Sequence, residues 1–278
     1  MRQNRVKRTL ASGGVSVGTM VFEFNTPGIG RLASEAGADF VVFDMEHTGW
    51  SVETIRNLVA TSKSAPVAPV VRVPTSQYHF IAGCLDAGAM GIMVPMVESE
   101  QQAKSVVESA MYPPFGKRGA AFGIAHDDYT GGDIIEKMQG ANTEVLIICQ
   151  IETAEGVKNA EKIAAVEGVD VLWIGHYDLT NSLGIPGEFG HERYISSVQA
   201  VLSACARHGK AAGFMTANVE EGKSLIRQGF RALAYWGDSW IYREALRSGI
   251  GGIMSEVLKP ASTVIALGAQ TQSGKQRK

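Results

Sequence analysis

The chain has 278 residues, of which 45% are hydrophobic and 19% are charged, and its formal net charge at pH 7 is −2. A charge this close to zero gives no electrostatic case for binding nucleic acid or an anionic membrane surface. No apolar run approaches the ~20 residues of a membrane span, and the basic N-terminus lacks the apolar stretch of a secretory signal.

Short apolar stretches, each followed by a helical pattern, recur along the chain. The first four predicted strands lie at 14–24, 39–47, 68–73 and 91–96. After a polar loop at 112–132, four more lie at 144–152, 169–175, 211–216 and 230–237. Continuously apolar strands indicate burial on both faces, as in a parallel sheet beneath helices. Eight strand–helix units without a linker predict one (β/α)₈ TIM barrel.

A doubly wound α/β sheet is the competing fold. It is disfavoured because the glycines of GIGRLASEAG, after the first strand, lack the spacing that holds a pyrophosphate. We therefore expect an N-terminal lead-in at 1–13, a single barrel domain at 14–255, and a C-terminal extension with a flexible tail at 256–278.

Three widely spaced cysteines each stand in an apolar setting: Cys84, Cys149 and Cys205. We expect buried, reduced thiols, which favours a cytoplasmic location.

Polar side chains follow several predicted strands, at the end where barrel enzymes carry their chemistry. These residues are Asp44, Glu46, His47, Arg72, Gln150, Glu152 and Asp178. Each alone has an ordinary explanation, such as a rim histidine, an arginine bound to loop carbonyls, or a carboxylate near a helix N-terminus. Their convergence on one rim is a stronger signal than any single residue.

The residue types at this rim suit a hard oxygen site. Two carboxylates with a nearby amide favour Mg²⁺, Mn²⁺ or Co²⁺ with several waters retained. A 2-oxo acid would chelate such a metal, and an enolate would be stabilised by the metal and Arg72, while a histidine manages the hydroxyl proton. No lysine lies in the eight predicted strands, which argues against a Schiff-base aldolase.

Six motifs extend this interpretation: FDMEH, VVRV, LDAGAMGIMVPMVES, YPPFGKRG, QIETAEGVKNAEKIAAVEGVDVLWIG and DLTNSLG. In them, from about residue 14 to 255, the chain resembles the metal-dependent class II pyruvate aldolases, the group of 2-dehydro-3-deoxyglucarate aldolase and 4-hydroxy-2-oxoheptanedioate aldolase. The resemblance implies a phosphoenolpyruvate/pyruvate-type barrel. It also implies reversible cleavage of a 4-hydroxy-2-oxo acid to pyruvate and an aldehyde through a metal-bound pyruvate enolate.

The resemblance further implies roles for matched residues. Glu152 and Asp178 match the metal ligands, and Asp178 also borders the substrate. Gln150 matches the residue that holds the substrate carboxylate region. Arg72 matches the arginine that stabilises the enolate and the cleaved C4 oxygen.

His47 matches the base of the family, and Asp86 matches an aspartate that raises the basicity of that histidine. Asp86 falls near the end of the third predicted helix, at the opposite rim of one barrel from His47. Either that helix boundary is wrong or the pair forms between subunits. The resemblance implies homo-oligomers, typically hexamers built as trimers of dimers, with a swapped C-terminal helix, here 240–255.

Three positions near the expected pocket depart from the family pattern. Met45 stands where relatives carry glycine, and His176 and Tyr177 replace a proline and a small residue. The Tyr177 backbone is still expected to contact the pyruvate carboxylate, while its side chain could reshape the pocket. Asp44 is expected to line the aldehyde side.

The loop at 119–133 also departs, because many relatives carry an arginine there. It offers His126, Asp127 and Asp128 instead. It is either a solvated acidic loop or one that disfavours aldehydes carrying a carboxylate or phosphate.

Two other functions remain open. One is a different enolate-forming lyase on the same barrel, such as an oxaloacetate decarboxylase or a citrate- or malyl-thioester lyase, although a basic nucleotide-binding surface is not evident. The other is a non-catalytic sensor of 2-oxo acids, which retention of the base, both carboxylates and the arginine disfavours. In the leading hypothesis the partners are small molecules, a 2-oxo acid and an aldehyde, and neither nucleic acid nor a membrane.

Overall fold

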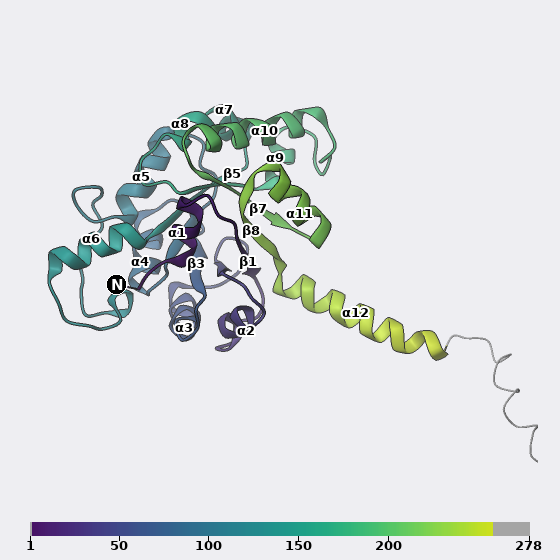
Figure 1. Cartoon of the computed structure of the whole chain (residues 1–278), viewed down its shortest axis with the longest axis horizontal. Helices are drawn as coiled ribbons and strands as arrows, with labels where there is room; N and C mark the ends of the chain where they lie inside the picture. Colours follow the sequence, from purple (N-terminus) through teal and green to yellow (C-terminus); the bar gives the residue numbers. More distant parts are fainter. Residues whose placement is uncertain (1, 258–278) are drawn as a thin grey trace, which may run out of the picture. The chain divides into compact units, whose positions relative to one another are not determined.

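The structure, a computed structural model, describes residues 2–257. Eight parallel strands form a closed barrel in chain order, and β1 pairs with β8 to close it. Helices surround the strands, as Figure 1 shows. The predicted (β/α)₈ barrel is therefore confirmed.

The strands lie close to the ranges predicted from the sequence. They are β1 (Ser16–Val21), β2 (Phe40–Asp44), β3 (Ala68–Arg72), β4 (Gly91–Val94), β5 (Leu146–Ile151), β6 (Val171–Ile174), β7 (Ala211–Thr216) and β8 (Phe230–Gly237). The helices are α1 (Arg5–Ala11), α2 (Ile29–Glu35), α3 (Val52–Ser62), α4 (Tyr78–Asp86), α5 (Glu100–Ala110), α6 (Ile134–Glu144), α7 (Ala154–Lys158), α8 (Ala160–Ala164), α9 (His176–Ser182), α10 (Glu192–Arg207), α11 (Val219–Gln228) and α12 (Asp238–Val257). A short 3₁₀ helix, η1, spans Ala125–Asp127.

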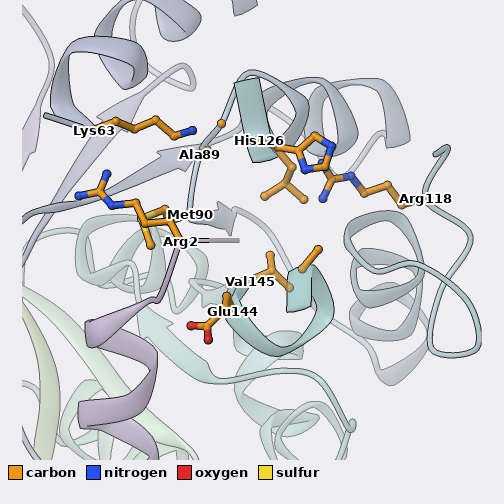
Figure 2. Close-up of a pocket in the computed structure, with 11 residues that line it drawn as sticks. Arg2, Lys63, Ala89, Met90, Arg118, His126, Glu144 and Val145 are labelled. Carbon is orange, nitrogen blue, oxygen red and sulfur yellow. The ribbon is translucent and has the colours of Figure 1, made fainter. Parts of the chain in front are cut away.

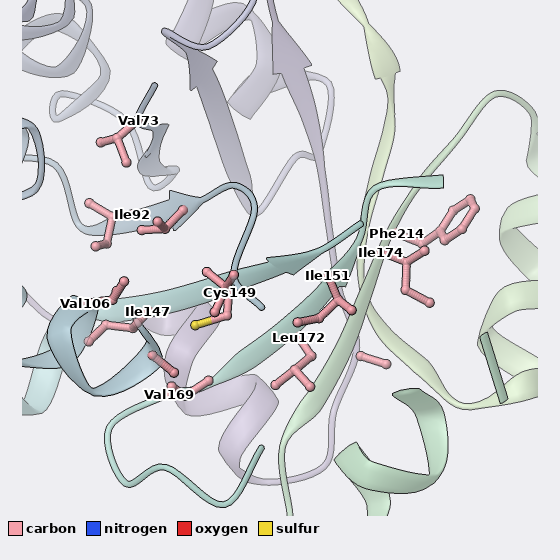
Figure 3. Close-up of a cluster of buried hydrophobic side chains, with 14 of the residues drawn as sticks. Val73, Ile92, Val106, Ile147, Cys149, Ile151, Val169, Leu172, Ile174 and Phe214 are labelled. Carbon is pink, nitrogen blue, oxygen red and sulfur yellow. The ribbon is translucent and has the colours of Figure 1, made fainter. Parts of the chain in front are cut away.

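Two buried layers follow from the alternation of side chains along each strand. The outer layer lies between the strands and the helices and includes Phe43, Val71 and Cys149. Figure 3 shows part of it around β5 and β6. The inner cluster fills the barrel and includes Val42 and Val70. A side chain two positions beyond an inner residue on the same strand therefore also faces inward.

Helix α1 lies in segment 1–13, which we expected from the sequence to be an N-terminal lead-in to the barrel. The Asn4 side chain caps it by accepting a hydrogen bond from the Lys7 backbone. Val6 and Leu10, one turn apart, are buried in the inner cluster. Asn4 also donates to the carbonyl of Met90, just before β4, so α1 is held at the amino-terminal rim.

The chain divides into two compact units, one ending at Ser239 and one beginning at Trp240. The first contains the barrel and the second contains most of α12. Most of the expected extension at 256–278 lies outside the described residues, and the predicted domain boundaries stay predictions.

The three cysteines are free, buried thiols, as predicted. Burial raises the pKa of Cys84, Cys149 and Cys205 to about 12. Within residues 2–257, no helix is both long and apolar enough to cross a membrane.

Candidate active site

Three polar side chains continue the inward-facing rows of the barrel at the carboxyl ends of their strands. Asp44 follows Val42 on β2, Arg72 follows Val70 on β3, and Gln150 follows Ile148 on β5. The register of β2 and β3 pairs Asp44 directly with Arg72. The predicted polar residues of these strands therefore share one rim of the barrel interior.

Arg72 is buried and held from three sides. Its Nε donates a 2.6 Å hydrogen bond to Asp44 Oδ1 and lies 3.3 Å from Glu46 Oε2. Its guanidinium also lies over the Phe22 ring, 5.7 Å from the ring centroid. These contacts fix the direction in which the guanidinium presents its remaining N–H groups.

Asp44 has no exposed surface, and its carboxylate is fully engaged. Besides the bond from Arg72, it accepts hydrogen bonds from the backbone N–H groups of Glu46 (3.1 Å) and His47 (3.0 Å). From the sequence, we expected Asp44 to line the side of the site that binds the aldehyde. The geometry instead favours a positioning role, in which Asp44 holds Arg72 and the turn that carries His47.

Glu46 links the arginine to the histidine. Its Oε2 atom lies 3.7 Å from Nε2 of His47, whose side chain is exposed. Burial raises the pKa of Glu46 to about 7, and the charges of Glu152, Asp44 and Asp178 add to this while Arg72 opposes it. These three carboxylates therefore lie close enough to Glu46 to affect its ionisation.

Glu152 lies just beyond β5 and is almost completely buried. Its Oε1 atom accepts a 2.7 Å bond from the backbone N–H of Met96, and its Oε2 atom accepts from Gln150 Nε2. Burial raises the pKa of Glu152, and the nearby Asp178 charge adds to the rise. Met96 adopts a left-handed backbone (φ 55°), a conformation that non-glycine residues rarely take.

The loop after β6 leaves room for the Glu152 side chain. A Cβ atom at Gly175 would stand 2.7 Å from Glu152 Cβ and 3.0 Å from Gln150 Nε2. Gly175 is followed at once by α9, which carries the exposed Asp178 in its first turn.

The residues at this rim fit a divalent cation. Within the described chain, the buried Oε1 atom of Gln150 has no hydrogen-bond donor. The nearby Asp178 charge adds to the cost of ionising Glu152, which a cation would relieve. Residues 2–257 contain no cluster of three or more His, Cys, Asp or Glu side chains that could hold a metal. Two carboxylates would therefore need water and substrate oxygens to complete the shell, as Mg²⁺ commonly does.

Two departures from the family pattern form an aromatic cluster beside this rim. His176 stacks on Phe214 of β7, with ring centroids 4.9 Å apart. Tyr177 is exposed and meets Phe189 edge to face at 5.4 Å. The histidine therefore packs between α9 and β7, whereas the tyrosine stays available at the surface next to Asp178.

Met45, the third departure, faces the other way. It is buried in the outer layer, and its sulfur lies 3.6 Å from the Cys84 sulfur of α4. Its bulk fills the space between barrel and helices, away from the barrel interior.

Asp86 is the last residue of α4, so its predicted place near the end of this helix is confirmed. The chain enters β4 five residues later, which places Asp86 at the amino-terminal rim, opposite the rim that carries His47. Asp86 instead forms a 2.6 Å ion pair with Arg118. A pair between Asp86 and His47 within one chain is therefore disfavoured, and a pair between subunits stays a prediction.

The loop at 119–133 also lies at the amino-terminal rim, because His126 shares a cavity with Met90 and Val145, which precede β4 and β5. His126 and Asp127 are buried, and Asp127 forms a 2.6 Å ion pair with Lys137 of α6. The interpretation as a solvated acidic loop therefore holds only in part, because Asp128 and Asp133 are exposed while Asp127 is buried. The alternative is not matched within one chain, since the loop does not lie at the carboxyl-terminal rim.

Four residues that support the site were not singled out from the sequence: Phe22, Met96, Gly175 and Asp238. Asp238, after β8, accepts backbone bonds from Phe22 (3.0 Å), Glu23 (3.0 Å) and Phe24 (2.6 Å). It thereby holds the loop that places Phe22 against Arg72. A glycine directly after an apolar strand was a usable signal for Gly175, but the other three depend on contacts between distant segments.

Comparisons with known proteins agree with this geometry. Residues 20–242 match the family model described as HpcH/HpaI aldolase/citrate lyase. A 5-keto-4-deoxy-D-glucarate aldolase of Shigella boydii serotype 18 is 31% identical over 242 residues, which cover 87% of this chain and 93% of that protein.

Solved structures give the same result. An HpcH/HpaI aldolase from Desulfitobacterium hafniense DCB-2 is 33% identical, with a TM-score of 0.85 over 89% of this chain and 96% of that one. An HpcH/HpaI aldolase/citrate lyase family protein from Burkholderia cenocepacia J2315 is 28% identical. Its TM-score is also 0.85, over 90% of this chain and 99% of that one.

Proposed function

This chain belongs to the HpcH/HpaI aldolase/citrate lyase family, and from that premise we propose that it is a divalent-metal-dependent aldehyde-lyase. Its reaction is the reversible cleavage of a 4-hydroxy-2-oxo acid to pyruvate and an aldehyde. The relative from Shigella boydii carries the name of an aldolase acting on a keto-deoxy sugar acid, which is a substrate of this chemical class.

One observation carries the proposal: a buried arginine and three interacting carboxylates share the carboxyl-terminal rim. Arg72 lies 3.3 Å from Glu46, and the Glu46 carboxyl is influenced by both Glu152 and Asp178. A buried guanidinium beside a hard oxygen site is suited to an oxyanion that forms on a 2-oxo acid.

The residues of the chain supply the proton and charge handling. His47, exposed and next to Glu46, takes the proton from the C4 hydroxyl as the C3–C4 bond breaks. The electron pair moves into the enolate of pyruvate, and Arg72, held in place by Asp44, stabilises its negative charge. The aldehyde then leaves, and the proton returns from His47, directly or through water, to C3 of the enolate, which gives pyruvate with no net change in protons.

Glu152 and Asp178 would hold the divalent cation, and the Gln150 side chain, which donates to Glu152, has an oxygen without a donor among the described residues. When bound, the cation would supply Lewis acidity toward the 2-oxo acid. Asp44 acts through Arg72 in this scheme, and Tyr177 borders the substrate from α9.

The test is release of pyruvate from a panel of 4-hydroxy-2-oxo acids, measured by coupling to lactate dehydrogenase. We expect turnover in the presence of Mg²⁺ or Mn²⁺ and its loss after chelation. Failure of every panel member to release pyruvate with metal present would contradict the proposal.

A second reaction of the same site is decarboxylation of oxaloacetate, which forms the same enolate by loss of CO₂. The chain matches a family described as aldolase/citrate lyase, which supports testing a second lyase reaction of this kind. If oxaloacetate is consumed while no 4-hydroxy-2-oxo acid is cleaved, decarboxylation is the main activity. If neither class reacts but 2-oxo acids still bind, the chain is a sensor.

We also propose that the working form is a homo-oligomer, a hexamer in the manner that the family resemblance implies, with α12 as the exchanged element. Apolar residues recur on α12 at helical spacing and are exposed: Leu246, Ile250, Ile253 and Met254. An exposed apolar stripe of this kind is typical of a helix that packs against another chain.

A further inference from the structure

The barrel closes at an irregular seam between β1 and β8. Gly18 and Met20 are two residues apart on β1, but their partners on β8 are three residues apart, so β8 carries one extra residue at this point. Trp236, within that part of β8, adopts a left-handed backbone (φ 45°), which non-glycine residues rarely take. Such a bulge bends a strand and redirects the side chains that follow it. The bulge therefore sets the direction of the Asp238 side chain, which comes directly after β8.

The Asp238 carboxylate is buried and accepts four backbone hydrogen bonds. Its Oδ2 atom accepts from the N–H groups of Glu23 (3.0 Å) and Phe24 (2.6 Å). Its Oδ1 atom accepts from the N–H groups of Phe22 (3.0 Å) and Ser239 (2.8 Å). Three of these four donors belong to the loop that leaves β1 at the carboxyl-terminal rim. One side chain after β8 thus fixes the path of that loop.

The loop that Asp238 holds begins with Phe22, whose ring lies against the guanidinium of Arg72. The guanidinium carbon is 5.7 Å from the ring centroid, and the ring also packs on the inner cluster of the barrel. Asp44 and Glu46 contact this guanidinium at Nε. An aromatic face beside the guanidinium adds a constraint that these two contacts do not supply, because it favours one orientation of the guanidinium plane. A shift of Phe22 would therefore turn the two Nη groups.

We propose that Asp238 is a positioning residue of the active site, which acts on the reaction through Phe22 and Arg72. This inference rests on the proposed function, in which Arg72 stabilises the enolate of pyruvate. A displacement of about 1 Å in a group that stabilises developing charge can lower a rate by about two orders of magnitude. The bulge at the β1–β8 seam, the Asp238 carboxylate and the loop at 22–24 together set the direction of the Arg72 guanidinium.

The first test is Asp238→Asn, in which an amide N–H₂ group replaces one acceptor oxygen and faces two backbone N–H groups. We expect kcat for pyruvate release to fall roughly 10–100-fold, with a much smaller change in KM, because Arg72 acts on charge that develops in the transition state. Glu144→Gln is the matched control. Glu144 also accepts a backbone hydrogen bond, from Asn4 at 2.5 Å, but it lies at the amino-terminal rim, and Figure 2 shows its carboxylate turned toward α1. The control should lower the thermal unfolding midpoint and keep kcat.

The second test asks whether Asp238 acts through Phe22. Phe22→Leu removes the ring but leaves the bonds to Asp238 in place, because they come from backbone N–H groups. This variant should lose kcat by a factor similar to that of Asp238→Asn. The double variant should be no slower than the slower single one, whereas independent effects would multiply. Multiplied losses, or a normal kcat in Asp238→Asn, would overturn the proposal.

A crystal structure of Asp238→Asn gives a readout that does not depend on activity. We expect the loop at 22–24 to be displaced and the Arg72 guanidinium to be turned. Phe22 and Arg72 in unchanged positions would overturn the proposal. If the wild-type chain neither releases pyruvate from any substrate nor exchanges the methyl protons of pyruvate, the proposed function fails, and the crystal structure still decides whether Asp238 places Arg72.

Discussion

At the scale of single residues, Arg72 and Asp44 depend on each other. Asp44 has no exposed surface, so removing the guanidinium leaves a carboxylate buried without its charged partner. We predict that Arg72→Ala loses about 3–5 kcal/mol of folding free energy and abolishes both cleavage and exchange of the pyruvate methyl protons. Urea unfolding and proton NMR measure the two effects.

The paired variant Arg72→Ala/Asp44→Asn separates stability from catalysis. It removes the unpaired charge, so it should recover much of the lost stability while staying inactive. Normal turnover in either variant would remove Arg72 from the mechanism, and an equally unstable double variant would show that the charge of Asp44 is not the cause.

The raised pKa of Glu46 predicts a pH-dependent cost to stability. A carboxyl whose pKa is about 7 in the folded chain and near 4.5 when unfolded binds its proton more tightly in the folded state. Its contribution is therefore fully present below about pH 4.5 and is lost as the pH rises through about 7. The 2.5-unit difference corresponds to at most ~3 kcal/mol, and partial exposure reduces it.

Glu46→Gln should remove this dependence. We expect the stability of the variant, relative to the wild-type chain, to increase between about pH 5 and about pH 8 in urea unfolding with a chelator present. A difference that stays constant or reverses over that range would contradict a raised pKa at Glu46.

Much of the site was predictable at this scale because of the two-residue period of a strand. Asp44, Arg72, Gln150 and Glu152 all fall on inward-facing positions, and the same period turns Met45 outward. The burial of Asp127 was not predictable, because its partner Lys137 lies on another element, and only the folded chain brings the two charges together.

At the scale of elements, the junction of β6 and α9 predicts a steric test of the metal site. A methyl group at Gly175 would crowd Glu152 and Gln150, although the backbone there does not require glycine. We predict that Gly175→Ala lowers affinity for Mn²⁺ by roughly 10–100-fold, as measured by titration calorimetry, and costs about 1–3 kcal/mol of stability because Glu152 must shift.

Gly190→Ala is the matched control for this substitution. A Cβ at Gly190 would meet no atom within 4 Å, and its φ is not positive. Equal Mn²⁺ affinity in the two variants would show that the space beside Glu152 is not needed for the metal.

The strands were predictable as elements because each is a short apolar run, and the observed bounds of β7 and β8 equal the predicted ones. Helix α1 was not predicted because its segment is rich in basic residues. The Asn4 cap and the Val6–Leu10 pair, one turn apart, were not recognised among them. The stability of α1 comes from burial of that pair in the inner cluster, which is a tertiary contact that a seven-residue helix needs.

At the scale of the whole molecule, His47 and Asp86 lie at opposite rims of one barrel and do not meet within one chain. Asp86 ends α4 and pairs with Arg118, whereas His47 follows β2 and lies beside Glu46. If Asp86 assists His47, it does so across a subunit interface, and the active site is complete only in an oligomer.

Subunit mixing tests this arrangement. His47→Asn and Asp86→Asn should each be nearly inactive alone. Because a site with an intact His47 would receive an intact Asp86 from the neighbouring chain, co-expressed heteromers should regain a substantial part of wild-type turnover. No recovery, with mixed oligomers verified by mass spectrometry, would place both functions within one chain or remove Asp86 from catalysis.

The contribution of α12 to subunit contacts is tested with Ile250→Asp, which places a charge on the apolar stripe of this helix. Light scattering measures the oligomer mass of the variant. The variant should dissociate and lose activity together.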